Sequence, residues 1–508
     1  MATGRLGEKA ARLGREWRGA GKGGERDGRR GVIFCVQGWG GMWDSGGGFE
    51  FSTGEPKMSK KLFGTDGVRG VANREPMMAE MALNLGRAVA YVLQKRKGGK
   101  RPRVLIGKDT RLSGYMLENA LTAGLLSMGA DAILVGTLPT PGIAVLVRDQ
   151  KADAGFVISA SHNPFEDNGI KLFSSDGFKL PDEEEEEIEA LMASGKLAEL
   201  LPTAGGIGKS FRVEDALRRY IDFCKGTFEE EDLKGMRIVL DCGNGATYKA
   251  APAVFKELGA AVTTLHCTPN GMNINARSGS QHTEALKEQV LAERADVGLA
   301  FDGDGDRLIV VDETGTELSG DHIMALCALD LKRHGRLKNN MMVGTVMSNF
   351  GLRVTAKEQG IELACSAVGD RYVLEVMKEK GAVIGAESSG HMIFLEKHTT
   401  GDGIVSALQM LGVMRRQKKE ISELASVLKL APQKLINVTT KSRPPLNELK
   451  GVQAAIREAE AELKDAGRVL VRYSGTQNMC RVMVEGPSDE MVERLCGKIA
   501  DAVKEEIG

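Results

Sequence analysis

The stretch Ala154-Gly155-Phe156-Val157-Ile158-Ser159-Ala160-Ser161-His162-Asn163-Pro164 contains an apolar run that stops abruptly at a small polar loop. Short apolar runs without polar interruption are typical of strands that are buried on both faces of a parallel sheet. The Asn-Pro ending predicts a rigid turn directly after the strand. Because α/β proteins bind ligands at the carboxyl ends of such strands, the stretch predicts an α/β sheet that presents Ser161 at its functional edge.

Ser161 supports two interpretations when it is considered alone. A serine next to a histidine is most often part of a hydroxyl-bonded turn or a helix N-cap. It can also be a functional hydroxyl held at a strand end. The choice between these interpretations depends on motifs elsewhere in the chain.

The alternation of strand, polar loop and helix recurs from residue 58 to about residue 430. Further short apolar runs lie at residues 104–106, 132–135, 237–240, 262–265, 297–301, 342–346 and 382–385. Runs separated by helical segments predict sheets that helices cover on both faces. Three blocks each contain one unusual polar loop after a strand, at 159–164, 302–307 and 387–391. This regularity predicts three similar α/β domains, at residues 58–212, 213–313 and 314–428.

The last segment, residues 429–508, has a different pattern and is predicted to form a smaller α+β domain. Apolar runs at 468–471 and 480–484 predict a hairpin, and a helix is expected from residue 488 to about 506. The loop Arg472-Tyr473-Ser474-Gly475-Thr476 offers a guanidinium, hydroxyls and backbone N–H groups, which suit a phosphate. Arg481 on the second strand adds a positive charge.

The first 57 residues differ in composition from the rest of the chain. All three tryptophans, Trp17, Trp39 and Trp43, lie there, and Gly and Arg are over-represented. The segment lacks hydrophobic periodicity, which predicts disorder. Its apolar run at 32–36 is too short for a signal peptide, and its acidic residues argue against a transit peptide. We therefore expect residues 1–57 to be a disordered or artefactual extension before a natural start at Met58.

Composition limits the classes of partner. The chain has 68 basic and 69 acidic residues, and this balance argues against nucleic acid or an anionic membrane surface. No apolar run reaches the length of a membrane span. The eight cysteines are dispersed without a C-x-x-C pair, which predicts reduced thiols in a cytoplasmic protein. We expect a small-molecule partner.

The loop Asp302-Gly303-Asp304-Gly305-Asp306-Arg307 follows a buried apolar run. Glycines between the carboxylates let the backbone curl so that the three side chains converge. Such carboxylates repel one another unless a hard divalent cation neutralises them. Ca²⁺ in an EF-hand is the alternative, because Glu313 occupies the twelfth position, but Arg307 stands where that loop requires glycine. We predict that Asp302, Asp304 and Asp306 hold Mg²⁺ in preference to Ca²⁺.

Two further polar stretches are expected to be structural. The acidic run at 182–187 opens a helical segment and is predicted to be a solvated face. The run Asp241-Cys242-Gly243-Asn244-Gly245-Ala246 lacks the lysine and hydroxyl that end a P-loop. A tight turn is therefore favoured there over a phosphate site.

From Lys61 to the C-terminus the chain resembles the α-D-phosphohexomutases, and within them the branch that acts on glucosamine phosphates. The resemblance rests on Phe63-Gly64-Thr65-Asp66-Gly67-Val68-Arg69-Gly70, on 159–164 with Asn168-Gly169-Ile170-Lys171, and on 302–307, 345–349, 368–373, 387–391 and 472–476. It implies three similar mixed-sheet α/β domains and a smaller C-terminal α+β domain, arranged around a central cleft.

The resemblance also implies roles for individual residues. The implied catalytic residues are Ser161 as phosphoserine, Lys171 and His391 for proton transfer, and Arg69, Arg111 and His162 near the moving phosphoryl group. The implied substrate contacts are Glu387 and Ser389 for the sugar, and Arg472, Ser474, Gly475, Thr476 and Arg481 for a phosphate. The implied ligands of one Mg²⁺ per subunit are Ser161, Asp302, Asp304 and Asp306.

The implied reaction interconverts glucosamine 6-phosphate and glucosamine 1-phosphate and feeds the synthesis of UDP-N-acetylglucosamine. Phospho-Ser161 passes its phosphoryl group to the sugar, glucosamine 1,6-bisphosphate forms as intermediate and activator, and the other phosphate returns to Ser161. A kinase or autophosphorylation first charges Ser161, and the family implies a homodimer. Tyr473 and Gln477-Asn478 depart from the family's phosphate loop, which carries prolines, so we expect a looser loop.

Two alternatives remain open at this stage. The first is a specificity for glucose or mannose phosphates, because a few ring contacts decide between the sugars. The second is a non-catalytic protein that binds calcium or a phosphosugar, which would carry no covalent phosphate at Ser161.

Overall fold

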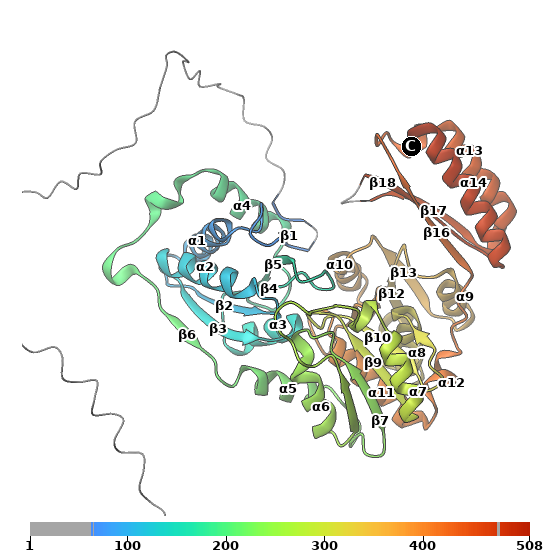
Figure 1. The fold of residues 1–508 in the computed structure, drawn as a ribbon, viewed down its shortest axis with the longest axis horizontal. Helices are drawn as coiled ribbons and strands as arrows, with labels where there is room; N and C mark the ends of the chain where they lie inside the picture. Colours follow the sequence, from blue (N-terminus) through green and yellow to red (C-terminus); the bar gives the residue numbers. More distant parts are fainter. Residues whose placement is uncertain (1–61, 65, 475–477) are drawn as a thin grey trace, which may run out of the picture. The chain divides into compact units, whose positions relative to one another are not determined.

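The computed structural model describes residues 62–64, 66–474 and 478–508, and Figure 1 shows its sheets and covering helices. The first sheet has the strand order β1-β5-β4-β2-β3-β6. Its strands are β1 (Val68–Val71), β2 (Arg103–Lys108), β3 (Asp131–Thr137), β4 (Ala154–Ile158), β5 (Asp167–Ser174) and β6 (Ser210–Arg212). Its helices are α1 (Ala79–Arg96), α2 (Gly114–Ser127), α3 (Thr140–Asp149) and α4 (Asp182–Ala193). The central strands run parallel, whereas β5 is antiparallel to both β4 and β1.

The side chains of β2 show how helices cover both faces of this sheet. Val104 and Ile106 belong to the apolar cluster formed with α1 and α2, whereas Leu105 belongs to the cluster that contains α3. This alternation follows from the two-residue repeat of a strand, and it requires apolar residues at every position. The short apolar run of β2 therefore forms a doubly covered strand, as predicted.

The second and third sheets repeat this arrangement with an antiparallel edge. The second sheet has the order β11-β10-β9-β7-β8 and the third β13-β12-β14-β15. Their strands are β7 (Arg237–Asp241), β8 (Ala261–Leu265), β9 (Val297–Phe301), β10 (Leu308–Asp312), β11 (Glu317–Leu318), β12 (Met341–Thr345), β13 (Glu362–Ser366), β14 (Ile384–Ala386) and β15 (Met392–Phe394). Their helices are α5 (Ala216–Gly226), α6 (Ala250–Glu257), α7 (Glu284–Glu293), α8 (Gly320–Arg333), α9 (Phe350–Glu358), α10 (Asp370–Lys380), α11 (Gly403–Gln417) and α12 (Ile421–Ala425).

The C-terminal segment forms an antiparallel sheet with the order β16-β18-β17 and two helices. Its elements are β16 (Gln433–Thr439), α13 (Lys450–Leu463), β17 (Arg468–Tyr473), β18 (Met479–Glu485) and α14 (Asp489–Ile507). Short 3₁₀ helices are η1 (Lys196–Leu200), η2 (Ala204–Gly206), η3 (Ala246–Tyr248), η4 (Gly279–Gln281), η5 (Lys338–Asn340), η6 (Leu446–Glu448) and η7 (Lys464–Ala466). The predicted fold class, three mixed α/β domains and a smaller α+β domain, is confirmed. The precise domain boundaries and the central cleft stay predictions.

The apolar cores divide the molecule into two parts. One continuous cluster includes Leu105 of the first sheet, Leu299 of the second and Ile384 of the third. The C-terminal domain has a separate core, which contains Val482 and Ile499. The three α/β sheets are therefore held together by shared apolar packing, whereas the fourth domain is stabilised by its own.

The acidic run that opens α4 corrects one prediction. Asp182 forms an ion pair with Arg371 of α10, and buried Glu185 also lies within 3.3 Å of that guanidinium. The expected solvated face therefore includes two carboxylates that join the first α/β domain to the third. Neither carboxylate has a distinctive local sequence pattern, because the partner lies far along the chain.

No helix in the described ranges is long and apolar enough to span a membrane. This agrees with the absence of a long apolar run in the sequence.

Candidate active site

Ser161 lies at the carboxyl end of β4 with its backbone in an unusual conformation. Its φ of 53° falls in the left-handed region, which side chains other than glycine rarely adopt. The Ser161 N–H donates to Ser159 Oγ at 2.9 Å, and Ser159 Oγ donates to Asp109 Oδ2 at 2.6 Å. Such a strained position persists when surrounding contacts hold it, and it is typical of functional sites.

Arg111 holds the serine loop from behind. The guanidinium is fully buried, and its Nε donates to Asp109 Oδ2 at 2.8 Å. Its two terminal nitrogens donate to the backbone carbonyls of four loop residues, Ser161, Asn163, Pro164 and Asp167. Arginine has five N–H donors, and five acceptors meet them here. The side-chain donors of Arg111 are therefore taken up by Asp109 and the backbone of the serine loop, and its role near the phosphoryl group stays a prediction.

The second domain also contacts this loop. Asn275 Nδ2 donates to the carbonyls of Ser161 and Asn163, both at 2.9 Å. A Cβ atom on Gly303 would lie 2.6 Å from Ser161 O, so only glycine permits this close approach. The serine loop is therefore fixed by residues from both the first and second domains.

The three aspartates of the loop after β9 converge beside Ser161, as predicted. Each offers a carboxylate oxygen, and these oxygens all lie within 4.8 Å of one another. Ser161 Oγ donates to Asp302 Oδ2 at 2.7 Å, and Thr140 Oγ1 donates to Asp304 Oδ2 at 2.7 Å. Burial, and then the charges of Asp306 and Asp304, raise the pKa of Asp302 well above its usual range.

The donor set fits a hard divalent cation. Asp304 Oδ1 and Asp306 Oδ1 are buried without a hydrogen-bond partner, and a buried carboxylate oxygen without a partner is costly. Three carboxylates and the Ser161 hydroxyl form an all-oxygen group of the kind that Mg²⁺ and Ca²⁺ accept. Glu313 points elsewhere, since its carboxylate accepts hydrogen bonds from Ser422 of α12. The EF-hand alternative is therefore wrong.

Cationic side chains surround the carboxylates. Lys171 Nζ lies 3.0 Å from Asp304 Oδ2 and 3.2 Å from Asp66 Oδ2. Burial opposes a charge on Lys171, but the nearby carboxylates of Asp304, Asp66 and Asp306 raise its pKa overall. Arg69 forms an ion pair with Asp66, and its Nη1 donates to Ala160 O at 3.5 Å. These cations offset the negative charge that a phosphoryl group would add.

His162 faces a cation rather than an acid. Its Nδ1 lies 3.3 Å from Ser161 Oγ and accepts from Arg307 Nη1 at 3.1 Å. Burial, then the charges of Arg307 and Arg69, lower the pKa of His162 to about 4. The imidazole is therefore neutral at pH 7, and the Ser-His-acid arrangement of a hydrolase is not formed.

The third domain brings its polar loop to the same place. His391 pairs with Arg307 through an isolated β-bridge, and its Nε2 lies 3.6 Å from Asp370 Oδ2 and 4.0 Å from Asp306 Oδ2. Glu387 Oε1 accepts from the backbone N–H of Gly369 at 3.0 Å. Ser389 lies in the same loop between β14 and β15. His391 Nε2 is buried without a hydrogen-bond partner, which leaves it available to a ligand.

The C-terminal domain carries a pair of arginines. Arg472 on β17 lies directly opposite Arg481 on β18. Burial and the charge of Arg481 lower the pKa of Arg472, and Arg481 Nε is buried without a partner. Two adjacent cations without an acidic partner in the described chain are suited to a phosphate. Gly475 and Thr476 lie outside the described residues, as does Gln477, so the predicted roles of that loop segment stay predictions.

Tyr473 bears on the expected loosening of the phosphate loop. Its hydroxyl donates to Pro444 O at 2.7 Å. This bond fixes the end of β17 in a position where the resemblance predicted proline. Tyr473 therefore does not support the prediction of a looser loop.

Several residues of the site were not predicted. They are Arg307, Thr140, Asn275, Asp66 and Asp370. Asp66, Arg307 and Asp370 stand inside motifs that the sequence analysis quoted, so their polar character within those motifs was a usable signal. Thr140 and Asn275 are contributed through tertiary packing and have no local signal.

Known proteins resemble this chain over most of its length. The phosphoglucomutase/phosphomannomutase family matches four successive segments: its alpha/beta/alpha domains I, II and III match residues 60–199, 218–315 and 319–430, and its C-terminal domain matches 435–502. The phosphoglucosamine mutase of Syntrophus aciditrophicus is 58% identical over 449 residues, which cover 88% of this chain and 100% of that protein. The phosphoglucosamine mutase of Syntrophobacter fumaroxidans is 57% identical over 448 residues, covering 88% and 99%.

Solved structures show the same fold. A phosphoglucomutase/phosphomannomutase family protein from Burkholderia thailandensis is 24% identical, with a TM-score of 0.73 over 88% of this chain and 98% of that one. The N-acetylphosphoglucosamine mutase of Aspergillus fumigatus, solved with GlcNAc-6P and magnesium, is 17% identical, with a TM-score of 0.58 over 87% and 95%. The sequence relatives and the four family matches show that the chain belongs to the phosphoglucosamine mutases of the α-D-phosphohexomutase family.

Proposed function

We propose that this protein interconverts glucosamine 6-phosphate and glucosamine 1-phosphate through phospho-Ser161 and glucosamine 1,6-bisphosphate. The observation that carries the proposal is the hydrogen bond from Ser161 Oγ to Asp302 Oδ2, which places the hydroxyl at the edge of the aspartate triad. The relatives that share more than half of their residues with this chain are named for the same activity.

Asp302, Asp304 and Asp306 are proposed to hold one Mg²⁺ beside the phosphate of Ser161. The bound ion would supply neutralisation of the charge that develops on the serine oxygen when it departs. Mg²⁺ is favoured over Ca²⁺ because three protein oxygens leave octahedral positions for phosphate and water.

In the first half-reaction a free sugar hydroxyl attacks the phosphorus of phospho-Ser161, the bond from phosphorus to Ser161 Oγ breaks, and the sugar hydroxyl loses its proton. In the second, Ser161 Oγ attacks the other phosphate of the bisphosphate, the bond from phosphorus to the sugar oxygen breaks, and that oxygen takes up a proton. Lys171 and His391 are proposed to handle that proton, one for each orientation of the sugar. Lys171, Arg69 and Arg307 also stabilise charge on the phosphoryl group. Arg111 keeps the loop in its strained conformation, so the phosphoryl group stays in line with the hydroxyl.

The bisphosphate must turn over between the two half-reactions, so one phosphate site has to accept either end. Arg472 and Arg481, with Ser474, Gly475 and Thr476, are proposed to form that site. Glu387 and Ser389 are proposed to bind sugar hydroxyls in both orientations. A kinase or autophosphorylation would place the first phosphate on Ser161.

The free thiols of the seven described cysteines support the proposal of a cytoplasmic enzyme. The family resemblance also predicts a homodimer, which light scattering of the full chain would test.

Turnover of three substrates tests the proposed specificity. The phosphorylated enzyme is assayed with glucosamine 1-phosphate, glucose 1-phosphate and mannose 1-phosphate, each with Mg²⁺ and after chelation. The proposal expects the highest kcat/KM for the amino sugar and loss of turnover without the metal. A higher kcat/KM for glucose or mannose phosphate would contradict the proposed substrate, and full turnover after chelation would contradict the metal assignment.

A further inference from the structure

Cys242 and Cys267 come together at the carboxyl ends of two neighbouring strands. β7 and β8 are parallel and pair Asp241 with Leu265; Cys242 is the first residue after β7, and Cys267 is the second after β8, beyond His266. The two segments stay side by side beyond the strands, since Cys242 N donates to Leu265 O at 3.2 Å and Asn244 N donates to His266 O at 2.7 Å. Both are free thiols, both pack in the same apolar cluster, and each affects the pKa of the other. Two thiols on adjacent strands lie within the reach of a disulfide.

The two thiols differ in access and acidity. Cys242 is fully buried, whereas Cys267 is half-buried. The neighbouring Cys242 thiol lowers the pKa of the Cys267 thiol, and Thr264 adds to this effect against the opposing effect of burial. The same contact and burial raise the pKa of Cys242 well above its usual range. An accessible, more acidic thiol beside a buried thiol is the arrangement of an attacking and a resolving cysteine.

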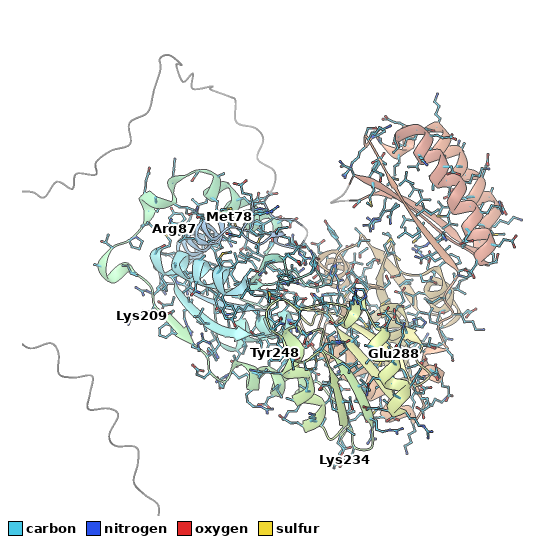
Figure 2. All side chains as sticks on the ribbon, in the orientation of Figure 1. Met78, Arg87, Lys209, Lys234, Tyr248 and Glu288 are labelled. Carbon is cyan, nitrogen blue, oxygen red and sulfur yellow. The ribbon has the colours of Figure 1, made fainter. Side chains whose placement is uncertain are left out.

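The turn after Cys242 connects this pair to the active site. Asn275 N donates to Gly243 O at 2.8 Å, and the Asn275 side chain donates to Ser161 O. Ala246 N donates to Gly303 O at 2.8 Å, in the loop that carries the aspartates. In Figure 2 Tyr248 marks the end of this turn, and Lys234 marks the opposite end of β7. A shift of the turn would therefore be transmitted to both the serine loop and the aspartate loop.

We propose that Cys267 and Cys242 form a reversible disulfide in response to a peroxide, and that this disulfide inhibits the enzyme by displacing the turn that supports Asn275 and Gly303. The Cys267 thiolate attacks one peroxide oxygen, the O–O bond breaks, and a sulfenic acid and water form. Cys242 then attacks the Cys267 sulfur, the S–S bond forms, and the sulfenic oxygen leaves as a second water. Two thiols and one hydrogen peroxide thus give one disulfide and two waters. The inhibition rests on the proposed mutase function, whereas the disulfide itself does not.

The test treats purified full-length protein, freed of reductant, with hydrogen peroxide. Peptide mass mapping is expected to show a single bond between Cys242 and Cys267 and a mass lower by two hydrogens. Mutase activity is expected to fall roughly 10- to 100-fold, as small displacements of reacting groups cause, and to return with dithiothreitol. Calorimetry with Mg²⁺ alone is expected to show weaker binding after oxidation, and this readout does not depend on any sugar substrate.

Two variants sharpen the test. Cys267→Ser is expected to remain active and to lose both the cross-link and the sensitivity to peroxide. Cys365→Ser removes the other half-buried thiol and is expected to respond as the wild type. Oxidation that leaves Cys267 unlinked, or a cross-link that changes neither activity nor Mg²⁺ binding, would overturn the proposal. If the reduced enzyme lacks mutase activity, the proposed function fails, and peptide mapping and calorimetry still decide the disulfide and its effect.

Discussion

The serine loop and the arginine pair of the C-terminal domain differ in how many of their polar groups find partners within the protein. Ser161 is buried, and Arg111, Asn275 and Asp302 all form hydrogen bonds with it. Arg472 and Arg481 lie side by side, and no ion pair to an acidic group is formed by either within the described residues. The folded protein therefore already holds the serine loop in place, whereas the arginine pair carries a positive charge that a bound anion would neutralise.

The packing around the two regions differs in the same way. The serine and aspartate loops lie at the edges of sheets that share one continuous apolar core. The C-terminal domain has its own core, and hydrogen bonds connect this domain to the third domain. Phe350 N donates to Glu485 Oε1 at 2.9 Å, and Arg468 Nη2 donates to Ser348 O at 2.6 Å. The serine and aspartate loops therefore lie on a shared framework, whereas the proposed phosphate site belongs to a domain with a smaller attachment.

The largest effect is expected when the serine loop loses the Ser161 hydroxyl. Ser161→Ala removes the oxygen that we propose accepts the phosphoryl group, so turnover should fall by about 10³-fold or more. Coupled assay of glucosamine 6-phosphate formation measures this loss. Ser175→Ala, at an exposed serine of the same domain, is the matched control. Turnover of Ser161→Ala within a few-fold of the control would show that Ser161 does not carry the phosphoryl group.

The next effect concerns the support behind the serine loop. Arg111→Lys keeps the charge but replaces the planar group that meets five acceptors, so the loop carbonyls and Asp109 lose partners. The free energy of unfolding should fall by about 3 kcal/mol, and turnover should fall with it. Denaturant unfolding and the mutase assay measure the two changes. Arg103→Lys, at an exposed arginine on β2, should change neither; equal behaviour of the two variants would show that Arg111 does not hold the loop.

A smaller effect is expected at the arginine pair. Arg472→Ala removes one charge-assisted contact to phosphate, which should raise KM roughly 10- to 100-fold with a smaller change in kcat. Stability should stay near that of the wild type, because the variant also relieves repulsion with Arg481. Arg494→Ala, in the exposed ion pair with Glu462 of the same domain, is the control. An unchanged KM would exclude Arg472 from phosphate binding.

The smallest expected effect is on the pH dependence of stability, and it is caused by Asp321, near the contact between the third and fourth domains. Asp321 Oδ2 accepts from Asn349 N at 2.8 Å, and burial raises the pKa of Asp321 to about 6. The folded state thus holds a proton that the unfolded state releases, so this carboxyl's contribution to stability is full below about pH 4 and is lost as the pH rises through about 6. In Asp321→Asn, the free energy of unfolding lost between low and neutral pH should be smaller by about 2 to 3 kcal/mol.

Urea unfolding of both proteins at about pH 4 and about pH 7 measures this difference. The wild type should lose stability relative to Asp321→Asn between the two values. An equal change in both proteins would show that Asp321 is ionised in the folded state at low pH.

The sequence predicted those features whose cause is local. Glycines between Asp302, Asp304 and Asp306 let the carboxylates converge, and the apolar run before Ser161 placed the serine at a strand end. The family resemblance implied that Arg111 lies near the moving phosphoryl group. Its five acceptors come from a loop that forms only in the folded protein, so their number was not visible.

Contacts between distant segments account for the other differences. Asp182 and Glu185 read as a solvated helix face, because their partner Arg371 lies in another domain. The contact between Cys242 and Cys267 depends on the parallel pairing of β7 with β8, whereas the cysteines are simply dispersed along the sequence. The local sequence pattern therefore identified the candidate catalytic residues, whereas tertiary packing determines which other residues hold them in place.

The state of Ser161 during the reaction tests the central claim most directly. The protein is isolated in its phosphorylated form, mixed with an equal amount of glucosamine 1-phosphate, quenched and analysed by peptide mass. The account predicts a phosphate on Ser161 before mixing, and after mixing a fraction of unphosphorylated Ser161 with matching glucosamine 1,6-bisphosphate. Interconversion of the sugar phosphates by protein whose Ser161 never carries phosphate would contradict it.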